Sequence, residues 1–176
     1  YKENLYKPMP GYRFIASNTD RSRYYVGELN GKSSKQAYMD ALHISESNII
    51  NQTFHNPLGK MNGQDICIIS LKEVSGNGLC CYRQVNDSDV LVLLEEQDYN
   101  EILDETLQRI RRDFNHISGV FSINCVFRYL LFSQEHHMED YLKTMSTLGD
   151  HAGLIGFGEH YNQQFVNQTM TCVVFE

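Results

Sequence analysis

The sequence predicts an α+β fold in which about three helices pack on a mixed β-sheet. Short runs rich in apolar and β-branched residues are separated by Asn-Gly turns, and two other segments repeat apolar residues at helical spacing. The first half of the chain carries hairpins, and the second half alternates strand-like and helical segments. This order is typical of a sheet with helices packed on it.

Composition excludes one large class of partner. The chain has 176 residues and 41% apolar content, which fits one globular domain with a sizeable core. Acidic residues outnumber basic ones, 22 to 15, and the net charge of −7 would repel a phosphate backbone. We therefore expect no nucleic-acid partner. No apolar run approaches the length needed to span a bilayer, so we also expect no membrane insertion of this segment.

The cysteines and the chain ends suggest a cytoplasmic piece of a longer protein. The five cysteines are an odd number and lie mostly inside apolar runs, which favours a reducing compartment. The first residues do not resemble a signal peptide, and the sequence starts without Met and stops after a strand-like run. We interpret residues 1–24 as a junction segment that follows a preceding domain, and residues 25–176 as the domain proper.

In the first half, segments 12–15 and 24–29 read as two short strands closed by the turn Asn30-Gly31. Ser33 and Gln36 have the spacing of a capping box that opens a helix. Residues 45–60 are polar and irregular and predict a loop, with one helical turn as the alternative within it. Apolar runs at 66–71 and 79–85 flank Ser75-Gly76-Asn77-Gly78 and predict a hairpin, and residues 90–94 predict a central strand.

In the second half, Asp98 caps a helix whose acidic residues come early and whose arginines come late, as the helix dipole favours. These arginines are best interpreted as solvated helix surface. Residues 119–126 form the most strand-like run, and Ser133 is predicted to cap a third helix that ends at Gly149. Strands over 152–157 and 169–175 close the chain.

Polar residues gather where these strand-like segments end, and polar groups there need a partner or a ligand. The sequence places Arg128 after the strand of 119–126, Glu159 after Gly156-Phe157-Gly158, and Asn167 to Thr169 at the start of the last strand. This pattern indicates a binding site.

Four motifs follow one another over about residues 25–175: Glu28-Leu29-Asn30-Gly31-Lys32, Cys125 with Arg128, Gly153 with Phe157-Gly158-Glu159, and Phe165-Val166-Asn167-Gln168-Thr169. In this order they resemble the C-terminal domain of the FIST family (F-box and intracellular signal transduction). The resemblance implies a cytoplasmic sensory domain that binds a small ligand such as an amino acid. It also implies two partners in the same polypeptide, a preceding FIST N-terminal domain and a downstream signalling domain.

The candidate residues suit such a ligand. The Arg128 guanidinium can grip a carboxylate at two points, and Glu159 can hold an ammonium group. A structural salt bridge between Arg128 and Glu159 is the alternative for both. Asn167 and Thr169 are two residues apart and so are expected on one strand face, with Cys125 and Gly158 as supporting positions. Asn167 as a turn residue is the alternative there.

Two other classes of function stay open. A thiol-dependent enzyme could use Cys125 as nucleophile with His160 as base, although a cysteine inside an apolar strand is more often an inert core residue. A pure protein-interaction module would use an apolar patch or a sheet edge. The scattered histidines do not favour a metal site, and no cofactor is expected.

Overall fold

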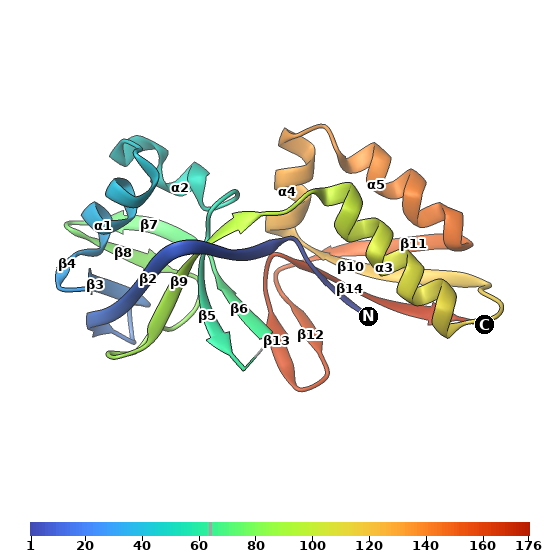
Figure 1. Cartoon of the computed structure of the whole chain (residues 1–176), viewed down its shortest axis with the longest axis horizontal. Coiled ribbons are helices and arrows are strands. Elements are labelled where there is room, and N and C mark those ends of the chain that lie inside the picture. Colours follow the sequence, from blue (N-terminus) through green and yellow to red (C-terminus); the bar gives the residue numbers. More distant parts are fainter. Residues whose placement is uncertain (64) are drawn as a thin grey trace. The chain divides into compact units, whose positions relative to one another are not determined.

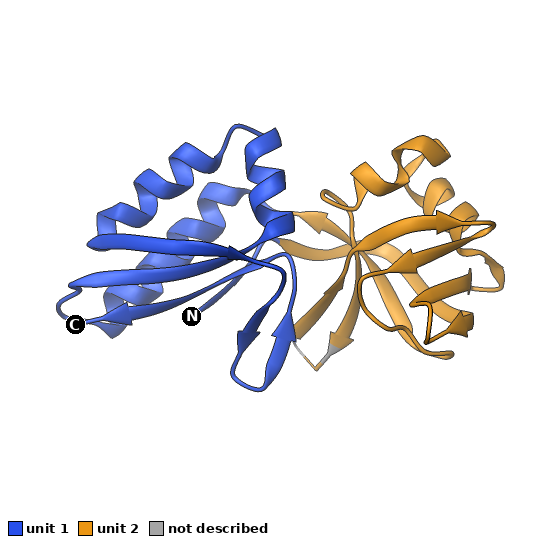
Figure 2. Cartoon of the chain, turned by 180° about the vertical axis from the view of Figure 1, so that it is seen from behind, with its two compact units in different colours: residues 1–5, 97–176 blue, residues 6–96 orange. Residues whose placement is uncertain are grey.

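The chain folds into two compact units. The computed structural model describes residues 1–63 and 65–176. Unit 1 contains residues 1–5 and 97–176, and unit 2 contains residues 6–96 (Figure 2). Unit 2 is thus inserted in the sequence of unit 1, whereas the composition had suggested one domain. Residues 1–24 supply strands to both units, and their interpretation as a junction segment stays a prediction.

Unit 2 is built on an antiparallel sheet with the strand order β6-β5-β9-β2-β3-β8-β7, and β4 pairs with β3 (Figure 1). Its strands are β2 (Tyr6–Asp20), β3 (Tyr25–Leu29), β4 (Lys32–Ser33), β5 (Leu58–Asn62), β6 (Asp65–Ile69), β7 (Leu71–Ser75), β8 (Gly78–Cys81) and β9 (Val90–Glu96). The predicted strand of 90–94 is β9, and its central place between β2 and β5 is confirmed.

Two tight turns of unit 2 close hairpins, one at Asn30-Gly31 and one at Gly76-Asn77. Asn30 and Gly31 both have positive φ, 52° and 72°, and they join β3 to β4, whereas the sequence suggested that they close the pair of 12–15 and 24–29. The second hairpin pairs β7 with β8 around Gly76. The predicted strand of 66–71 divides at Ser70, because β6 pairs with β5 and β7 pairs with β8.

Two helices complete unit 2. The helix α1 (Ser34–Leu42) begins as predicted, with the Ser33 side chain accepting a hydrogen bond from the backbone N–H of Gln36. The segment predicted as a loop contains a 3₁₀ turn at Glu46–Asn48 and the short helix α2 (Ile49–Gln52). Residues from α1 and the sheet strands share one core, including Tyr38, Leu58 and Leu93.

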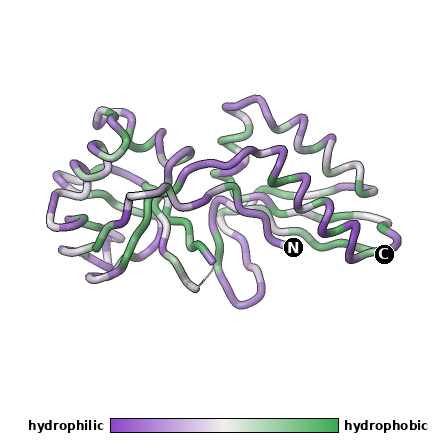
Figure 3. The backbone as a smooth tube through the Cα atoms, in the orientation of Figure 1, coloured by the Kyte–Doolittle hydropathy of each residue, from purple (hydrophilic) through white to green (hydrophobic). Residues whose placement is uncertain are grey.

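Unit 1 has a mixed sheet of four strands in the order β1-β14-β10-β11, and a separate hairpin β12-β13. Its strands are β1 (Lys2–Asn4), β10 (Gly119–Cys125), β11 (Asp150–Gly156), β12 (Glu159–Tyr161), β13 (Gln164–Val166) and β14 (Thr169–Phe175). Only β10 and β11 are parallel among these described pairs, and the helices of residues 126–145 connect them as a parallel pair requires. Figure 3 shows the β12-β13 segment coloured mainly hydrophilic.

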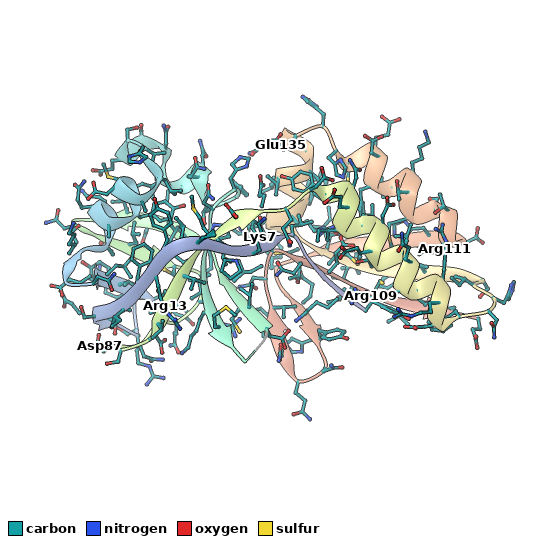
Figure 4. All side chains as sticks on the ribbon, viewed as in Figure 1. Lys7, Arg13, Asp87, Arg109, Arg111 and Glu135 are labelled. Atoms are coloured by element: carbon teal, nitrogen blue, oxygen red, sulfur yellow. The ribbon has the colours of Figure 1, made fainter. Side chains whose placement is uncertain are left out.

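The helix α3 (Tyr99–Asp113) is confirmed together with its cap. The Asp98 side chain accepts hydrogen bonds from the backbone N–H groups of Asn100 and Glu101. Leu103, Leu107 and Ile110 are buried. Arg109 and Arg111 are exposed, as predicted, and Figure 4 shows both on this helix.

The helical part between β10 and β11 differs from the prediction. One helix capped by Ser133 was expected, whereas the chain forms α4 (Val126–Gln134) and α5 (Met138–Met145), followed by a 3₁₀ turn at Ser146–Leu148. Ser133 lies inside α4 and donates a hydrogen bond to the carbonyl oxygen of Tyr129. The described residues therefore form five α-helices where about three were predicted, and the α+β class is correct.

Candidate functional site

Arg128 is a buried residue of unit 1 that pairs with the N-terminal strand. It lies in the first turn of α4, whereas the sequence placed it only after the strand of 119–126 and did not predict a helix there. Only 1% of its surface is exposed. Its Nη2 donates a hydrogen bond to Oε1 of Glu3, which lies on β1 and is also buried. A buried ion pair therefore joins α4 to the edge strand β1.

Aromatic rings and orphaned polar atoms surround this pair. The Arg128 guanidinium lies 4.6 Å from the ring centroid of Phe132 and 5.5 Å from that of Tyr141, within reach of cation–π attraction. Among the residues that the structure describes, Arg128 Nε and Nη1 and Glu3 Oε2 are buried without a hydrogen-bond partner. Buried polar atoms in folded proteins are rarely left in this state.

Glu159 lies on β12 and is bound to the last strand. Its Oε2 accepts a hydrogen bond from the Thr169 hydroxyl at 2.8 Å, and its Oε1 is buried with no partner in the described part of the chain. Burial raises the pKa of Glu159 to about 7, although the hydrogen bond from Thr169, the neighbouring Cys125 thiol and the charge of Arg128 counteract the rise. Arg128 thus acts on Glu159 through its field, while its ion pair is with Glu3.

Cys125 precedes α4 and is buried beside Glu159. Burial is the main cause that raises the pKa of its thiol, and the Glu159 carboxyl adds to the rise. The protonated thiol is a poor nucleophile, so this environment does not favour a catalytic cysteine. The proposed base His160 is exposed and packs edge-on against the ring of Phe165.

Asn167 and Thr169 do not share a strand face. The strand β13 ends at Val166 and β14 begins at Thr169, and Gln168 between them has a φ of 53°. Asn167 therefore lies in a turn, which was the alternative interpretation. It lies beside Gly158, because a Cβ at Gly158 would be 3.1 Å from Asn167 Oδ1.

We expect Gly158→Ala to lower the free energy of unfolding of unit 1. The φ of Gly158 is +130°, a conformation that L residues rarely adopt, and such strain amounts to about 1–3 kcal/mol. Urea unfolding followed by the amide NMR signals of unit 1 measures this change. Gly156→Ala is the matched control, since Gly156 lacks the positive φ, and its effect should stay within about 1 kcal/mol. Equal effects of the two changes would contradict the role assigned to Gly158.

The cluster thus contains the six residues predicted from the sequence and one that was missed. Glu3 is that residue. Its side chain faces inward because β1 pairs with β14, with Glu3 opposite Met170. A single acidic residue in a segment without a clear period carries no sequence signal of such a partner.

Comparison with known families decides the family of this chain. Residues 35–162 match the family model of the FIST C domain. The chain belongs to the FIST C domain family. The match includes Cys125, Arg128 and Glu159 and continues from unit 2 into unit 1 of this FIST C domain. No curated protein and no solved structure was found to match it.

The family fixes the broad role. FIST C domains are associated with sensory roles and signal transduction. None of the described helices of this FIST C domain is long and apolar enough to cross a membrane. Within the described residues, no three His, Cys, Asp or Glu side chains come together in a way that could hold a metal ion.

Proposed function

We propose that this FIST C domain is a cytoplasmic, non-enzymatic sensory domain that binds a small ligand, and that an amino acid is the first candidate. The observation that carries the proposal is the group of buried polar atoms without partners at Arg128, Glu3 and Glu159. Two are guanidinium donors and two are carboxyl oxygens, and all belong to described residues of one cluster.

An amino acid carries the complementary groups. Its carboxylate can accept a hydrogen bond from either Nε or Nη1 of Arg128, which are charged donors on different edges of the guanidinium. Its ammonium group can donate to the free oxygens of Glu3 and Glu159. A bound amino acid would therefore satisfy polar atoms that otherwise lower the stability of the fold. Thr169, Cys125, Gly158 and Asn167 support Glu159 and its turn.

The ligand must reach atoms that are buried in the described structure, so binding requires some opening of unit 1. A preceding FIST N-terminal domain in the same polypeptide is part of the proposal, as is a downstream signalling domain that responds to the bound state. The two competing interpretations gain less support. The raised pKa of the Cys125 thiol speaks against a thiol enzyme, and buried polar atoms without hydrogen-bond partners are not a feature that an interaction module needs.

A thermal-shift experiment tests this proposal. A library of amino acids is added to the longer polypeptide that includes the proposed FIST N-terminal domain, and the melting temperature is measured. A ligand at one hundred times its dissociation constant stabilises a protein by about 2.7 kcal/mol, which corresponds to a rise of roughly 5–10 °C in melting temperature. We expect at least one amino acid to give such a rise. We expect the double variant Glu3→Leu/Arg128→Met to fold and to lose it.

Arg111→Met is the matched control for this experiment. Arg111 is an exposed arginine of α3 that donates a hydrogen bond to Thr147, away from the buried ion pair. The variant should keep the full thermal shift. A library without any hit, or a shift that survives in the double variant, would contradict the proposal.

A further inference from the structure

A pocket of unit 1 lies between the sheet and its helices. It has a volume of about 240 Å³ and is lined by β10, β11, α4 and α5. The Arg128–Glu3 pair and Glu159 do not line it. The edge strand β11 is incompletely covered there, and Ile155 and Leu142 in the pocket wall are 47% exposed each. The pocket is therefore accessible from solvent.

Gly153 forms part of the pocket wall next to Ser122. A Cβ at Gly153 would lie 2.6 Å from the Ser122 carbonyl oxygen and 2.7 Å from its Oγ. Any side chain at position 153 would thus collide with the neighbouring strand. The glycine allows the Ser122 hydroxyl to sit close to β11.

A directed chain of hydrogen bonds runs through the pocket wall. Asn124 Nδ2 donates to the Tyr141 hydroxyl at 2.9 Å, and the Tyr141 hydroxyl donates to Ser122 Oγ at 3.3 Å. Ser122 Oγ lies 2.9 Å from His151 Nε2. Burial lowers the pKa of His151, so its ring is neutral at pH 7 and Nε2 can accept the Ser122 proton.

This series of hydrogen bonds leaves one acceptor atom without a donor. Asn124 is 7% exposed, and its Oδ1 is buried without a hydrogen-bond partner among the described residues. The neighbouring donors of the pocket wall already have acceptors: Asn124 Nδ2 donates to Tyr141, the Tyr141 hydroxyl to Ser122, and the Ser122 hydroxyl to His151. An occupant that donates one hydrogen bond would satisfy Asn124 Oδ1 after displacing the side chains that cover this buried atom.

The other residues of the pocket wall determine the polarity and the size of the occupant. Met138, Leu142 and Ile155 are apolar, and each described lining residue is neutral once His151 is deprotonated. A cavity of about 150 Å³ holds benzene, so a pocket of this volume holds one aromatic group with a substituent or a fused ring. A charged amino acid does not suit such a wall, because burying a charge without a partner is unfavourable.

We propose that this pocket binds a neutral aromatic compound with a single N–H or O–H donor, and that Asn124 Oδ1 accepts the hydrogen bond of that donor. Tyr141 borders both this pocket and the Arg128 guanidinium, but Arg128, Glu3 and Glu159 do not line the pocket, and this proposal does not depend on the amino-acid proposal.

Indole and benzofuran are a matched pair of probes, since they have nearly the same shape and only indole has an N–H donor. Titrations of the full chain followed by amide NMR should show shifts in β10, β11 and α5 with indole. We expect benzofuran to bind about tenfold more weakly, because it leaves Asn124 Oδ1 unsatisfied.

Two variants identify the site. Leu142→Trp fills the pocket from an exposed position and should abolish the indole shifts. Leu130→Trp is the control, since Leu130 is 39% exposed on α4 but does not line the pocket. Asn124→Leu should remove the preference for indole over benzofuran. Equal binding of the two probes to the unaltered chain, shifts that persist in Leu142→Trp, or no binding of indole at millimolar concentration would overturn the proposal.

Discussion

Replacing Glu3 with leucine is expected to lower the free energy of unfolding of unit 1 by about 3–5 kcal/mol, the range for breaking a buried ion pair. The change leaves the Arg128 guanidinium buried without a counter-charge, since Glu3 is its ion-pair partner. Urea unfolding monitored by amide NMR signals measures unit 1 and unit 2 separately, which matters because two units need not unfold as one.

The double variant Glu3→Leu/Arg128→Met tests the origin of this effect. Replacing both members of a buried pair with apolar residues is often neutral or stabilising, so most of the lost stability should return. The exposed pair between Lys35 and Glu46 serves as the comparison, and Glu46→Gln should change the stability of unit 2 by less than about 1 kcal/mol. If Glu3→Leu has an effect as small as Glu46→Gln, the buried pair has been misassigned. The same pair explains why Arg128→Ala alone is a poor test of ligand binding, since it would destabilise the fold.

The second large effect concerns pH. Burial raises the pKa of Glu159 from 4.5 to about 7. Below pH 4.5 the carboxyl is protonated in both states, whereas between 4.5 and 7 it ionises in the unfolded chain and keeps its proton in the native one. The free energy of unfolding should therefore fall as the pH rises through this window, by roughly 3 kcal/mol in total.

Glu159→Gln isolates this contribution. Glutamine has nearly the same shape and does not titrate. The free energy of unfolding of the variant should therefore not show the fall with rising pH that Glu159 causes. Histidines also titrate in this range, and burial lowers the pKa of His137 and His151, which acts in the opposite direction. Urea unfolding at several pH values gives the free energy of unfolding of the unaltered chain and of the variant. The contribution of the histidines is the same in both and cancels in the difference. A difference that does not vary with pH would show that the pKa of Glu159 is the same in the native and the unfolded state, which would contradict the prediction.

The sequence predicted structure correctly where a side chain interacts with residues close to it along the chain. Ser33 and Asp98 cap the helices that they were predicted to cap, because a side chain that accepts a backbone N–H two or three residues ahead is a local interaction. The Asn-Gly turn at Asn30 forms a hairpin for the same reason, although the strand that follows the turn was not foreseen. The family resemblance likewise followed from ordered motifs along the chain and is confirmed.

The transition from β10 to α4 could not be predicted from the sequence around it. Residues 126–134 are mostly apolar and have no capping side chain at Cys125, so periodicity could not separate the end of a strand from the start of α4. The helical state is decided by packing, since Arg128, Leu131 and Phe132 are buried on one face of α4. The same limitation explains why Asn167 and Thr169 were placed on one strand.

By itself the sequence determined the α+β class, the helix caps Ser33 and Asp98, the positions of two hairpin turns and the family of this protein. Only the tertiary structure decided that Arg128 pairs with Glu3, 125 positions away, and that Glu159 is bound to Thr169. Partners that are distant along the chain leave no periodic signal, because their contact exists only after β1 has added to the edge of the sheet. The division into two units was decided in the same way, by which strands pair and which do not.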